Sequence, residues 1–407
     1  MTVKISNNCK WVFCSESMLL QALLSIFLFL ISSIKLHAEP LPNEIIVGAE
    51  RTEQYITLLK NRRVAVVANP ASRVKNTHLV DTLFSLGVNV KAVFAPEHGF
   101  RGEAEAGEQV LGGTDPKTGV RVISLYGDHK KPDQNDMEGI DIVLFDLQDV
   151  GVRFYTYIST LQYIMEACAE YHVSLIILDR PNPNAHYVDG PVLKNEFRSF
   201  VGMQNIPVVY GMTIAEYALM LNGEKWLSNG VTCNLQVVKL LNWDHSKDYH
   251  LPVAPSPNLP NVASIRLYPS LCFFEGTSVS LGRGTDLPFQ SYGFPENKIG
   301  DYTFIPKSIK GKAKQPLYEN MVCKGNNVSV WAANNRPDKI HLQWLLETWS
   351  VYPKKENYFN SFFNKLAGNS ELRKQIEDGW SEEKIRASWE KDIADFRMIR
   401  MKYLLYP

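Results

Sequence analysis

The sequence lacks an excess of charge of either sign. Its 43 Lys and Arg residues balance 43 Asp and Glu residues, so the formal net charge is zero. Proteins that bind nucleic acids usually carry a basic excess, so this balance argues against a nucleic-acid partner. With 45% hydrophobic and 21% charged residues, the composition is typical of a globular protein and not of a disordered chain.

Several cofactor and catalytic motifs are also missing. The six cysteines contain no Cys-x-x-Cys pair, which argues against a zinc site. No Gly-x-Gly-x-x-Gly follows the first predicted strand, so dinucleotide binding has no support. No Gly-x-Ser-x-Gly elbow of a serine hydrolase is present either. We therefore expect no cofactor and no bound metal.

A long hydrophobic run occurs near the start of the chain, at residues 18–34. Lys4 and Lys10 precede it and Leu36-His37-Ala38 follows, an order typical of a signal peptide cleaved near Ala38. A single membrane anchor is the alternative, although the run is just short of the ~18–20 residues that span a bilayer. We predict that residues 1–38 are a signal peptide, that the mature protein is secreted or periplasmic, and that no stable membrane span remains.

Strand and helix patterns alternate between residues 43 and 238. Apolar runs that end in Pro, Gly or Asp predict buried strands, and helices are expected at 77–86, at 158–168 and after the capping box Thr213–Glu216. This alternation predicts a parallel sheet covered on both faces. The strands are expected at residues 63–69, 88–94, 120–126, 140–145 and 173–178.

The fold class is therefore α/β, with a Rossmann-like parallel sheet domain followed by a smaller α+β domain. Prolines crowd residues 252–260 and indicate an ordered crossing loop between the two. We predict a catalytic domain at 39–240 and a C-terminal domain at 241–407 that closes the cleft.

Polar residues gather where the predicted strands end. Asn69 follows the first strand, Glu97 and His98 the second, Asp146 the fourth and Asp179 the fifth. In open parallel sheets, ligands bind beyond the carboxyl ends of the strands. The pattern therefore predicts the rim of an active site.

Long motifs at these positions and beyond them carry a family resemblance. They are Pro96-Glu-His-Gly99, the run 146–157, Asp179-Arg-Pro-Asn-Pro183, Ser256-Pro-Asn258, Phe274-Glu-Gly-Thr277, Gly282-Arg-Gly-Thr285 and Tyr403-Leu-Leu-Tyr406. From residue 43 to 407 the chain resembles the exo-β-N-acetylmuramidase family. The resemblance implies a cleft between two domains, muroglycans derived from peptidoglycan as substrates, and release of N-acetylmuramic acid (MurNAc) from their non-reducing end.

Carboxylates are the first candidates for catalysis. A glycosidase generally uses one carboxylic acid to protonate the leaving oxygen and a second group at the anomeric carbon. We predict that Glu97 is the acid and that Glu275, next to aromatic residues that would raise its pKa by desolvation, is its partner. Asp115, Asp146 and Asp149 compete for the second role, and Asp146 is included in the predicted catalytic set. A substrate-assisted route through the N-acetyl oxygen remains open.

Recognition of MurNAc requires a cation, because the sugar carries a lactyl carboxylate. Arginine is preferred for bidentate carboxylate binding, and Arg101, Arg153, Arg180 and Arg283 all lie in motif loops. A structural salt bridge is the alternative role for each of them. The other predicted substrate-binding residues are Asn69, His98, Asp149, Tyr155, Asp179, Asn182 and Asn258.

Two other functions compete with the glycosidase. One is a non-catalytic protein that binds peptidoglycan fragments through the same Arg and Tyr residues. The other is a metal-dependent hydrolase, in which His98, Asp146, Asp149 and Asp179 would hold a hard metal. No His-x-x-x-His and no compact Asp-x-Asp loop supports this site. The stereochemistry, the tolerance of stem peptides and the oligomeric state are left open.

Overall fold

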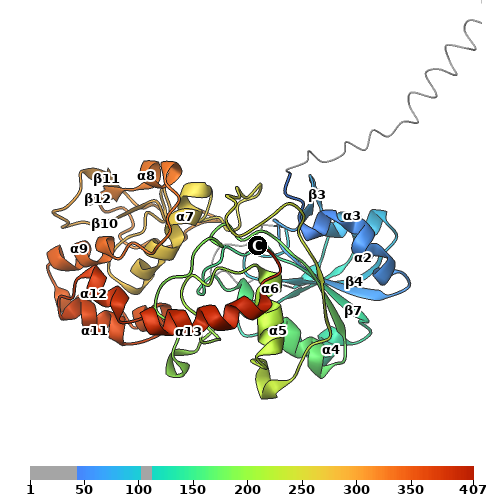
Figure 1. Ribbon diagram of the computed structural model, residues 1–407. Coiled ribbons are helices and arrows are strands. Elements are labelled where there is room, and N and C mark those ends of the chain that lie inside the picture. The colour runs from blue at the N-terminus through green and yellow to red at the C-terminus, as the bar shows by residue number, and fades with distance from the viewer. Residues whose placement is uncertain (1–43, 102–111) are drawn as a thin grey trace, which may run out of the picture. The chain divides into compact units, whose positions relative to one another are not determined.

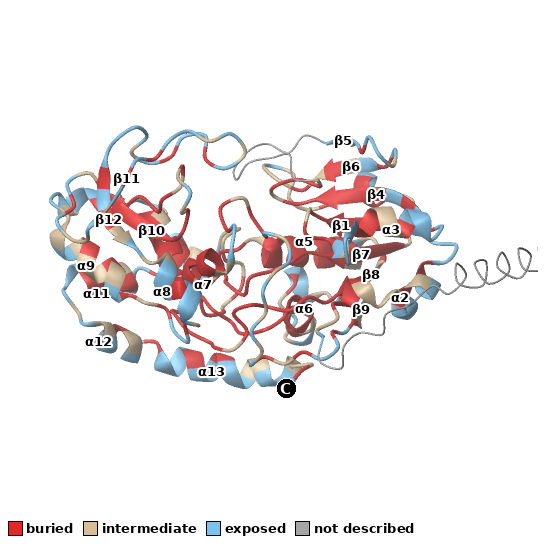
Figure 2. Ribbon diagram, turned by 90° about the horizontal axis from the view of Figure 1, so that it is seen from above, coloured by how far each residue is buried: buried red, intermediate tan, exposed pale blue. Residues whose placement is uncertain are grey.

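The central sheet of the computed structural model (Figure 1) has seven strands, in the order β5-β6-β4-β1-β7-β8-β9 that Figure 2 shows. The structure describes residues 44–101 and 112–407, so the predicted signal peptide lies outside the described residues. Strands β6, β4, β1, β7, β8 and β9 are parallel, and the short β5 is antiparallel to β6. The predicted parallel sheet is thus confirmed. The strands are β1 (Arg63–Ala68), β4 (Asn89–Ala95), β5 (Gly113–Thr114), β6 (Arg121–Ser124), β7 (Ile142–Asp146), β8 (Ser174–Leu178) and β9 (Leu235–Val238).

The central strands β1, β7 and β8 are buried along nearly their whole length because helices cover both faces of the sheet (Figure 2). Alternate side chains of one strand enter different cores: Val143 and Phe145 of β7 join one, and Ile142 and Leu144 the other. Successive residues of a strand point to opposite faces, so an unbroken apolar run is what two covered faces require. The first core extends into the C-terminal half of the chain, and the second lies under α2 and α3.

Four helices cover the sheet, with α2 (Thr52–Leu59) and α3 (Leu79–Ser85) on one face and α5 (Tyr157–Glu170) and α6 (Ile214–Gly223) on the other. The predicted capping box of α6 is confirmed, since the Thr213 hydroxyl accepts from the Glu216 amide and the Glu216 carboxylate accepts from the Thr213 amide. The helix predicted at 77–86 begins two residues later. Thr77 and His78 form β3, which pairs with β2 (Arg73–Val74), and the His78 ring then caps α3.

The C-terminal half is a mixed α+β region. Its three-stranded antiparallel sheet has the order β10-β12-β11, from β10 (Ser291–Phe294), β11 (Tyr302–Phe304) and β12 (Cys323–Asn327). The Pro-rich residues 252–260 form no regular element, as predicted. The helices are α7 (Val262–Leu271), α8 (Ser329–Asn334), α9 (Gln343–Val351), α10 (Phe363–Ala367), α11 (Glu371–Glu377), α12 (Glu382–Ala387) and α13 (Glu390–Arg400).

Residues 45–407 form one compact unit. The C-terminal segment returns to the sheet, where the Tyr406 hydroxyl donates to Asp179 (2.6 Å) and accepts from the Leu240 amide (2.9 Å). These contacts cross the predicted domain boundary near residue 240. The division into two domains stays a prediction. Within the described chain, no helix is long and apolar enough to cross a membrane. Cys168, Cys233, Cys272 and Cys323 are buried free thiols.

Candidate active site

A cavity of about 480 Å³ lies at the carboxyl edge of the sheet. Residues that follow β4, β6 and β7 line one side of it, and residues 256–289 together with Phe362 line the other. The chain adds strands first on one side of β1 and then on the other, so the strand order reverses at β1. Ligands of open α/β sheets usually bind beyond the carboxyl ends of the strands at such a point. The structure therefore places a pocket where the strand-end pattern predicted one.

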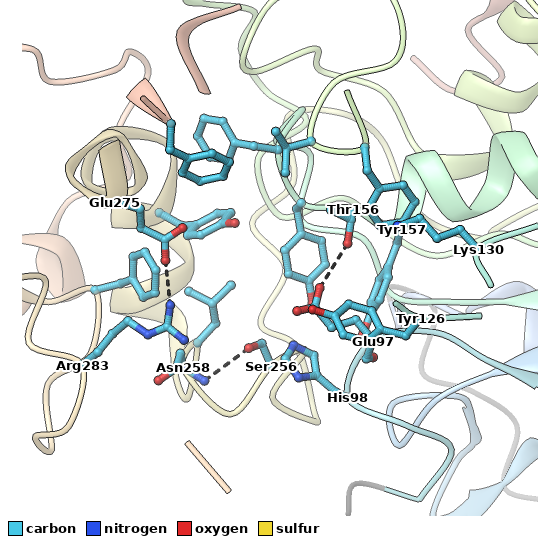
Figure 3. A pocket seen from close by; sticks show the side chains of 18 of the residues that line it. Glu97, His98, Tyr126, Lys130, Thr156, Tyr157, Ser256, Asn258, Glu275 and Arg283 are labelled. Carbon is cyan, nitrogen blue, oxygen red and sulfur yellow. Dashed lines mark hydrogen bonds and ion pairs between the residues drawn. The ribbon is translucent and has the colours of Figure 1, made fainter. Parts of the chain in front are cut away.

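Glu97 lies on the sheet side of this pocket (Figure 3). The turn that carries it is tight, since both His98 (φ 73°) and Gly99 (φ 77°) have left-handed backbones. The Thr156 hydroxyl donates to Oε2 of Glu97 (3.3 Å), and burial together with the hydrogen-bonded Glu97 carboxylate raises the pKa of Tyr126 to about 12. Hydroxyl groups from two loops thus orient this half-buried carboxylate.

Glu275 and Arg283 form an ion pair on the opposite side (Figure 3). Nη1 of Arg283 donates to Oε1 of Glu275 at 2.8 Å, and the Glu275 side chain is 25% exposed. Burial raises the pKa of Glu275, while Arg283 acts in the other direction by favouring the charged form. The repulsion from Glu97 also raises this pKa, so the two glutamates are electrostatic neighbours across the pocket.

Two buried polar atoms of the pocket have no protein partner within the described residues. They are Nδ1 of His98 and Oδ1 of Asn258, both in the wall between Glu97 and Arg283 (Figure 3). Burial lowers the pKa of His98, so its neutral form is favoured. Buried polar groups are normally satisfied, so these atoms are suited to bind hydroxyl or amide groups of a ligand.

Aromatic side chains form a continuous wall of the pocket. Tyr155 contacts Tyr157 and Tyr268 edge to face, with ring centroids 4.9 and 5.9 Å apart, and Tyr268 in turn contacts Phe289 at 5.1 Å. The Tyr155 hydroxyl donates to the Pro255 carbonyl (2.7 Å), which ties the crossing loop to the sheet domain. The apolar wall can therefore meet the carbon face of a sugar ring.

Asp146 and Arg180 were predicted site residues, but they do not line the pocket and pair with each other instead. Nε of Arg180 donates to Asp146 at 2.5 Å and Nη2 at 2.8 Å, and both side chains are almost fully buried. Asn69 also lies beneath the lining, where its amide donates to the Tyr157 hydroxyl (2.8 Å). Of these three residues, Asn69 therefore supports a side chain that lines the cavity.

Asp149, Asp179 and Asn182 are likewise buried outside the pocket lining. Burial raises the pKa of Asp149 to about 6 and that of Asp179 to about 7. Asp149 accepts hydrogen bonds from the Gly151 amide and the Tyr210 hydroxyl, and the Asn182 side chain donates to the Met212 carbonyl. Their hydrogen bonds hold the loops that follow β7 and β8.

Arg101 and Arg153 do not line the pocket either. Arg101 makes a bidentate ion pair with Asp115 and a second ion pair with Asp81. Arg153 is completely buried and donates four hydrogen bonds of 2.7–2.9 Å to backbone carbonyls, those of Pro191, Ile206, Leu366 and Ala367. Of the four predicted arginines, Arg283 is the one that the structure places in the pocket wall.

Several lining residues were absent from the predicted set. Thr156 lies in the run 146–157 and Tyr126 ends the predicted strand 120–126, so their positions at strand ends were a usable signal. Phe200, Tyr268 and Phe362 come from segments remote in sequence, and no local pattern identifies them. The added lining residues are Tyr126, Gly127, Lys130, Phe154, Thr156, Tyr157, Phe200, Val201, Ser256, Leu259, Tyr268, Phe289 and Phe362.

The structure does not bring together the residues of the alternative metal site. His98 lines the pocket, whereas Asp146, Asp149 and Asp179 do not. In the described ranges, one group has metal-ligand spacing: His129, Asp133 and Asp136. Asp133 and Asp136 already form the capping box of α4 (Gln134–Met137). The capping of this helix therefore explains why the two carboxylates lie close together.

The fold and the pocket together define a class of protein: an α/β enzyme with two glutamates facing each other across a sugar-sized cavity, as in a glycosidase. The sequence matches the models of exo-β-N-acetylmuramidase NamZ, the N-terminal part at residues 64–263 and the C-terminal part at 266–406. The chain belongs to this family.

Individual relatives agree with this assignment. The peptidoglycan β-N-acetylmuramidase NamZ of Bacillus subtilis (strain 168) is 38% identical over 373 residues, which cover 86% of this chain and 89% of that protein. Two crystal structures of DUF1343 family proteins from Bacteroides fragilis NCTC 9343 have the same fold. One is 45% identical with a TM-score of 0.82, covering 89% of this chain and 99% of that one. The other is 30% identical with a TM-score of 0.79, covering 90% and 100%.

Proposed function

We propose that this protein hydrolyses the β-glycosidic bond of a terminal MurNAc residue at the non-reducing end of peptidoglycan fragments. The family membership gives the reaction class, an exo-β-N-acetylmuramidase. The observation that carries the proposal for this chain is the pocket, in which Glu97 and Glu275 lie on facing walls.

Glu97 is proposed as the general acid. Two hydroxyl groups, of Thr156 and Tyr126, orient its carboxyl group toward the cavity. Such an acid delivers a proton to the leaving glycosidic oxygen as the bond to the anomeric carbon breaks.

Glu275 is proposed as the second carboxylate. The hydrogen bond from Arg283 favours its ionised form, and burial makes it a stronger base than an exposed glutamate. Its position on the opposite wall allows it to act on the other face of the sugar, at the anomeric carbon or on the attacking water. Asp146, bound to Arg180 outside the pocket lining, is left as a structural residue in this scheme.

The location of the reaction is a proposal from sequence. Residues 1–38 have the order of charges and apolar residues typical of a signal peptide. We therefore propose that the enzyme acts outside the cytoplasm, where peptidoglycan lies. Protease-protection of the protein in intact cells, compared with lysed cells, tests this location.

The proposed reaction is tested with the 4-nitrophenyl β-glycoside of MurNAc, incubated with and without a metal chelator. We expect release of nitrophenol that is insensitive to the chelator. Release that the chelator abolishes would favour the metal-dependent hydrolase. Binding of MurNAc without any release would favour the non-catalytic binding protein.

A further inference from the structure

Three basic side chains line the pocket: His98, Lys130 and Arg283. A substrate with a carboxylate needs one of them as its counter-ion, because burying an unpaired charge is costly. His98 is a poor candidate, since burial lowers its pKa and favours its neutral form. Arg283 already shares its charge with Glu275, which it contacts at 2.8 Å.

Lys130 differs from both, because no carboxylate is paired with it in the part of the chain that the structure describes. Its Nζ donates to the Gly127 carbonyl at 2.5 Å and lies 5.4 Å from the centroid of the Phe200 ring. A lysine ammonium has three donors, so donors remain after the bond to Gly127. The carbonyl and the aromatic face hold the ammonium at the pocket wall without neutralising it.

The position of Lys130 also separates it from the ion pair. Figure 3 shows Lys130 on the same side as Glu97, Tyr126 and Tyr157, while Glu275 and Arg283 lie opposite. The lactyl ether of MurNAc is on C3, two ring atoms away from the anomeric carbon. Lys130 lies on the same wall as Glu97, the proposed acid. When the glycosidic oxygen of the sugar meets Glu97, the Lys130 ammonium can therefore reach the lactyl group.

We propose that Lys130 binds the lactyl carboxylate and sets the preference of the enzyme for MurNAc over N-acetylglucosamine. This inference rests on the proposed function, because it places the terminal MurNAc in this pocket. It replaces the arginine that the sequence predicted with a lysine, which binds a carboxylate as a point charge and not through a bidentate fork. Lys130 is thus a specificity-determining residue, separate from the catalytic carboxylates.

The experiment compares two substrates that differ in the charge of the lactyl group and by one methyl group: the 4-nitrophenyl β-glycoside of MurNAc and its lactyl methyl ester. The wild-type enzyme should favour the acid by about 10- to 100-fold in kcat/KM, the effect expected for a hydrogen bond to a charged group, with most of it in KM. Lys130→Met keeps the length and apolar stem of the side chain and should treat acid and ester alike. Lys130→Arg keeps the charge and should keep the preference.

Lys131→Met is the matched control, because Lys131 is the next residue but pairs with Glu170 at 2.5 Å. It should retain the wild-type preference. A Lys130→Met enzyme that still favours the acid, or that loses activity equally on both substrates, would overturn the inference.

Failure of the proposed function gives a different result, since the wild-type enzyme would then hydrolyse neither substrate. Calorimetric titration with free MurNAc still tests Lys130 in that case. Lys130→Met should weaken the binding of MurNAc and leave that of N-acetylglucosamine unchanged. Equal affinity of wild type and Lys130→Met for MurNAc would contradict the role of Lys130.

Discussion

The side chains at the five predicted strand ends divide into two groups that the sequence does not distinguish. Glu97 and His98 face the cavity, whereas Asp146 and Asp179 are covered and bonded to protein groups. Both groups are polar and follow a buried strand, so position along the chain predicts the correct edge of the sheet. Which residue faces the ligand depends on partners that come from distant segments.

The arginines show why this information is missing from the sequence. Arg153 lies in a motif loop, yet its guanidinium is held by carbonyls of Leu366 and Ala367, more than 200 residues away. Arginine is the expected partner of a carboxylate on chemical grounds, but backbone carbonyls satisfy the same donors. A lysine ammonium carries the same positive charge, and the pocket presents Lys130 as well as Arg283.

The substitution Glu97→Gln tests whether Glu97 is the general acid. Glutamine keeps the shape and the hydrogen bonds but delivers no proton, so activity on a MurNAc disaccharide should fall by about 10²–10⁴-fold. The loss should be much smaller for the 4-nitrophenyl glycoside, whose leaving group departs with little protonation. Steady-state kinetics on both substrates measures the difference.

Glu275→Gln is the internal comparison, because burial raises the pKa of Glu275 and a raised pKa also suits a proton donor. We expect Glu275→Gln to lower the rate of hydrolysis of both substrates by a similar factor. If only Glu275→Gln shows the dependence on the leaving group, the two roles are reversed. Near-normal hydrolysis of the disaccharide by Glu97→Gln would remove Glu97 from the mechanism.

At the scale of elements, the sequence predicted the central sheet well. Unbroken apolar runs such as those of β1 and β8 indicate strands buried on both faces, and the Thr213 capping box fixed the start of α6. The small sheet was predicted only as part of a mixed region. Strand β12 reads Cys-Lys-Gly-Asn-Asn, which has neither an apolar run nor alternation, and it forms because β10 and β11 pair with it on both sides.

The ion pair of Asp146 and Arg180 joins the ends of β7 and β8, and its removal tests whether it is structural. Arg180→Met leaves Asp146 buried without its counter-ion, so the free energy of unfolding should fall by about 3–5 kcal/mol. Chemical denaturation followed by circular dichroism measures this change.

Arg63→Met is the control, since Arg63 pairs with Asp141 at 2.7 Å but is 51% exposed. Its loss should cost less than about 1 kcal/mol. If the Arg180→Met protein has normal stability but reduced affinity for MurNAc, Asp146 and Arg180 take part in substrate binding, as predicted from the sequence.

At the scale of the whole molecule, the C-terminal segment is part of the core around β8. The Tyr406 hydroxyl donates to Asp179, and the neighbouring Leu405 amide donates to Glu216. His245, beside them, bonds both to Glu216 (2.9 Å) and to the Pro407 carbonyl (2.8 Å). The buried acidic groups at this junction make the stability of the protein sensitive to pH.

Asp179 should make the protein less stable as the pH rises from about 4 to about 7. Burial raises its pKa to about 7 in the native state, so the folded protein keeps a proton that the unfolded chain releases near pH 4. The native state therefore binds more protons in this range, and the free energy of unfolding declines with pH. Asp179→Asn should flatten this decline, as measured by denaturation at several pH values.

Asp149, whose pKa is raised to about 6, should leave a residual slope in the Asp179→Asn protein. Asp141→Asn is the control, because Arg63 lowers the pKa of Asp141 to about 2 and its charge does not change above pH 4. A slope unchanged by Asp179→Asn would mean that Asp179 is ionised in the folded protein.

The return of residues 405–407 to the sheet also has a consequence for synthesis. A ribosome releases β1 to β9 long before it translates Tyr406, so the nascent sheet waits with Asp179, Leu240 and the adjoining apolar surface uncovered. Exposed surface of this kind makes partly folded chains prone to aggregation. Translation that stops before Tyr406 therefore yields a chain that has both proposed catalytic glutamates but leaves Asp179 and Leu240 without their bonds to this residue.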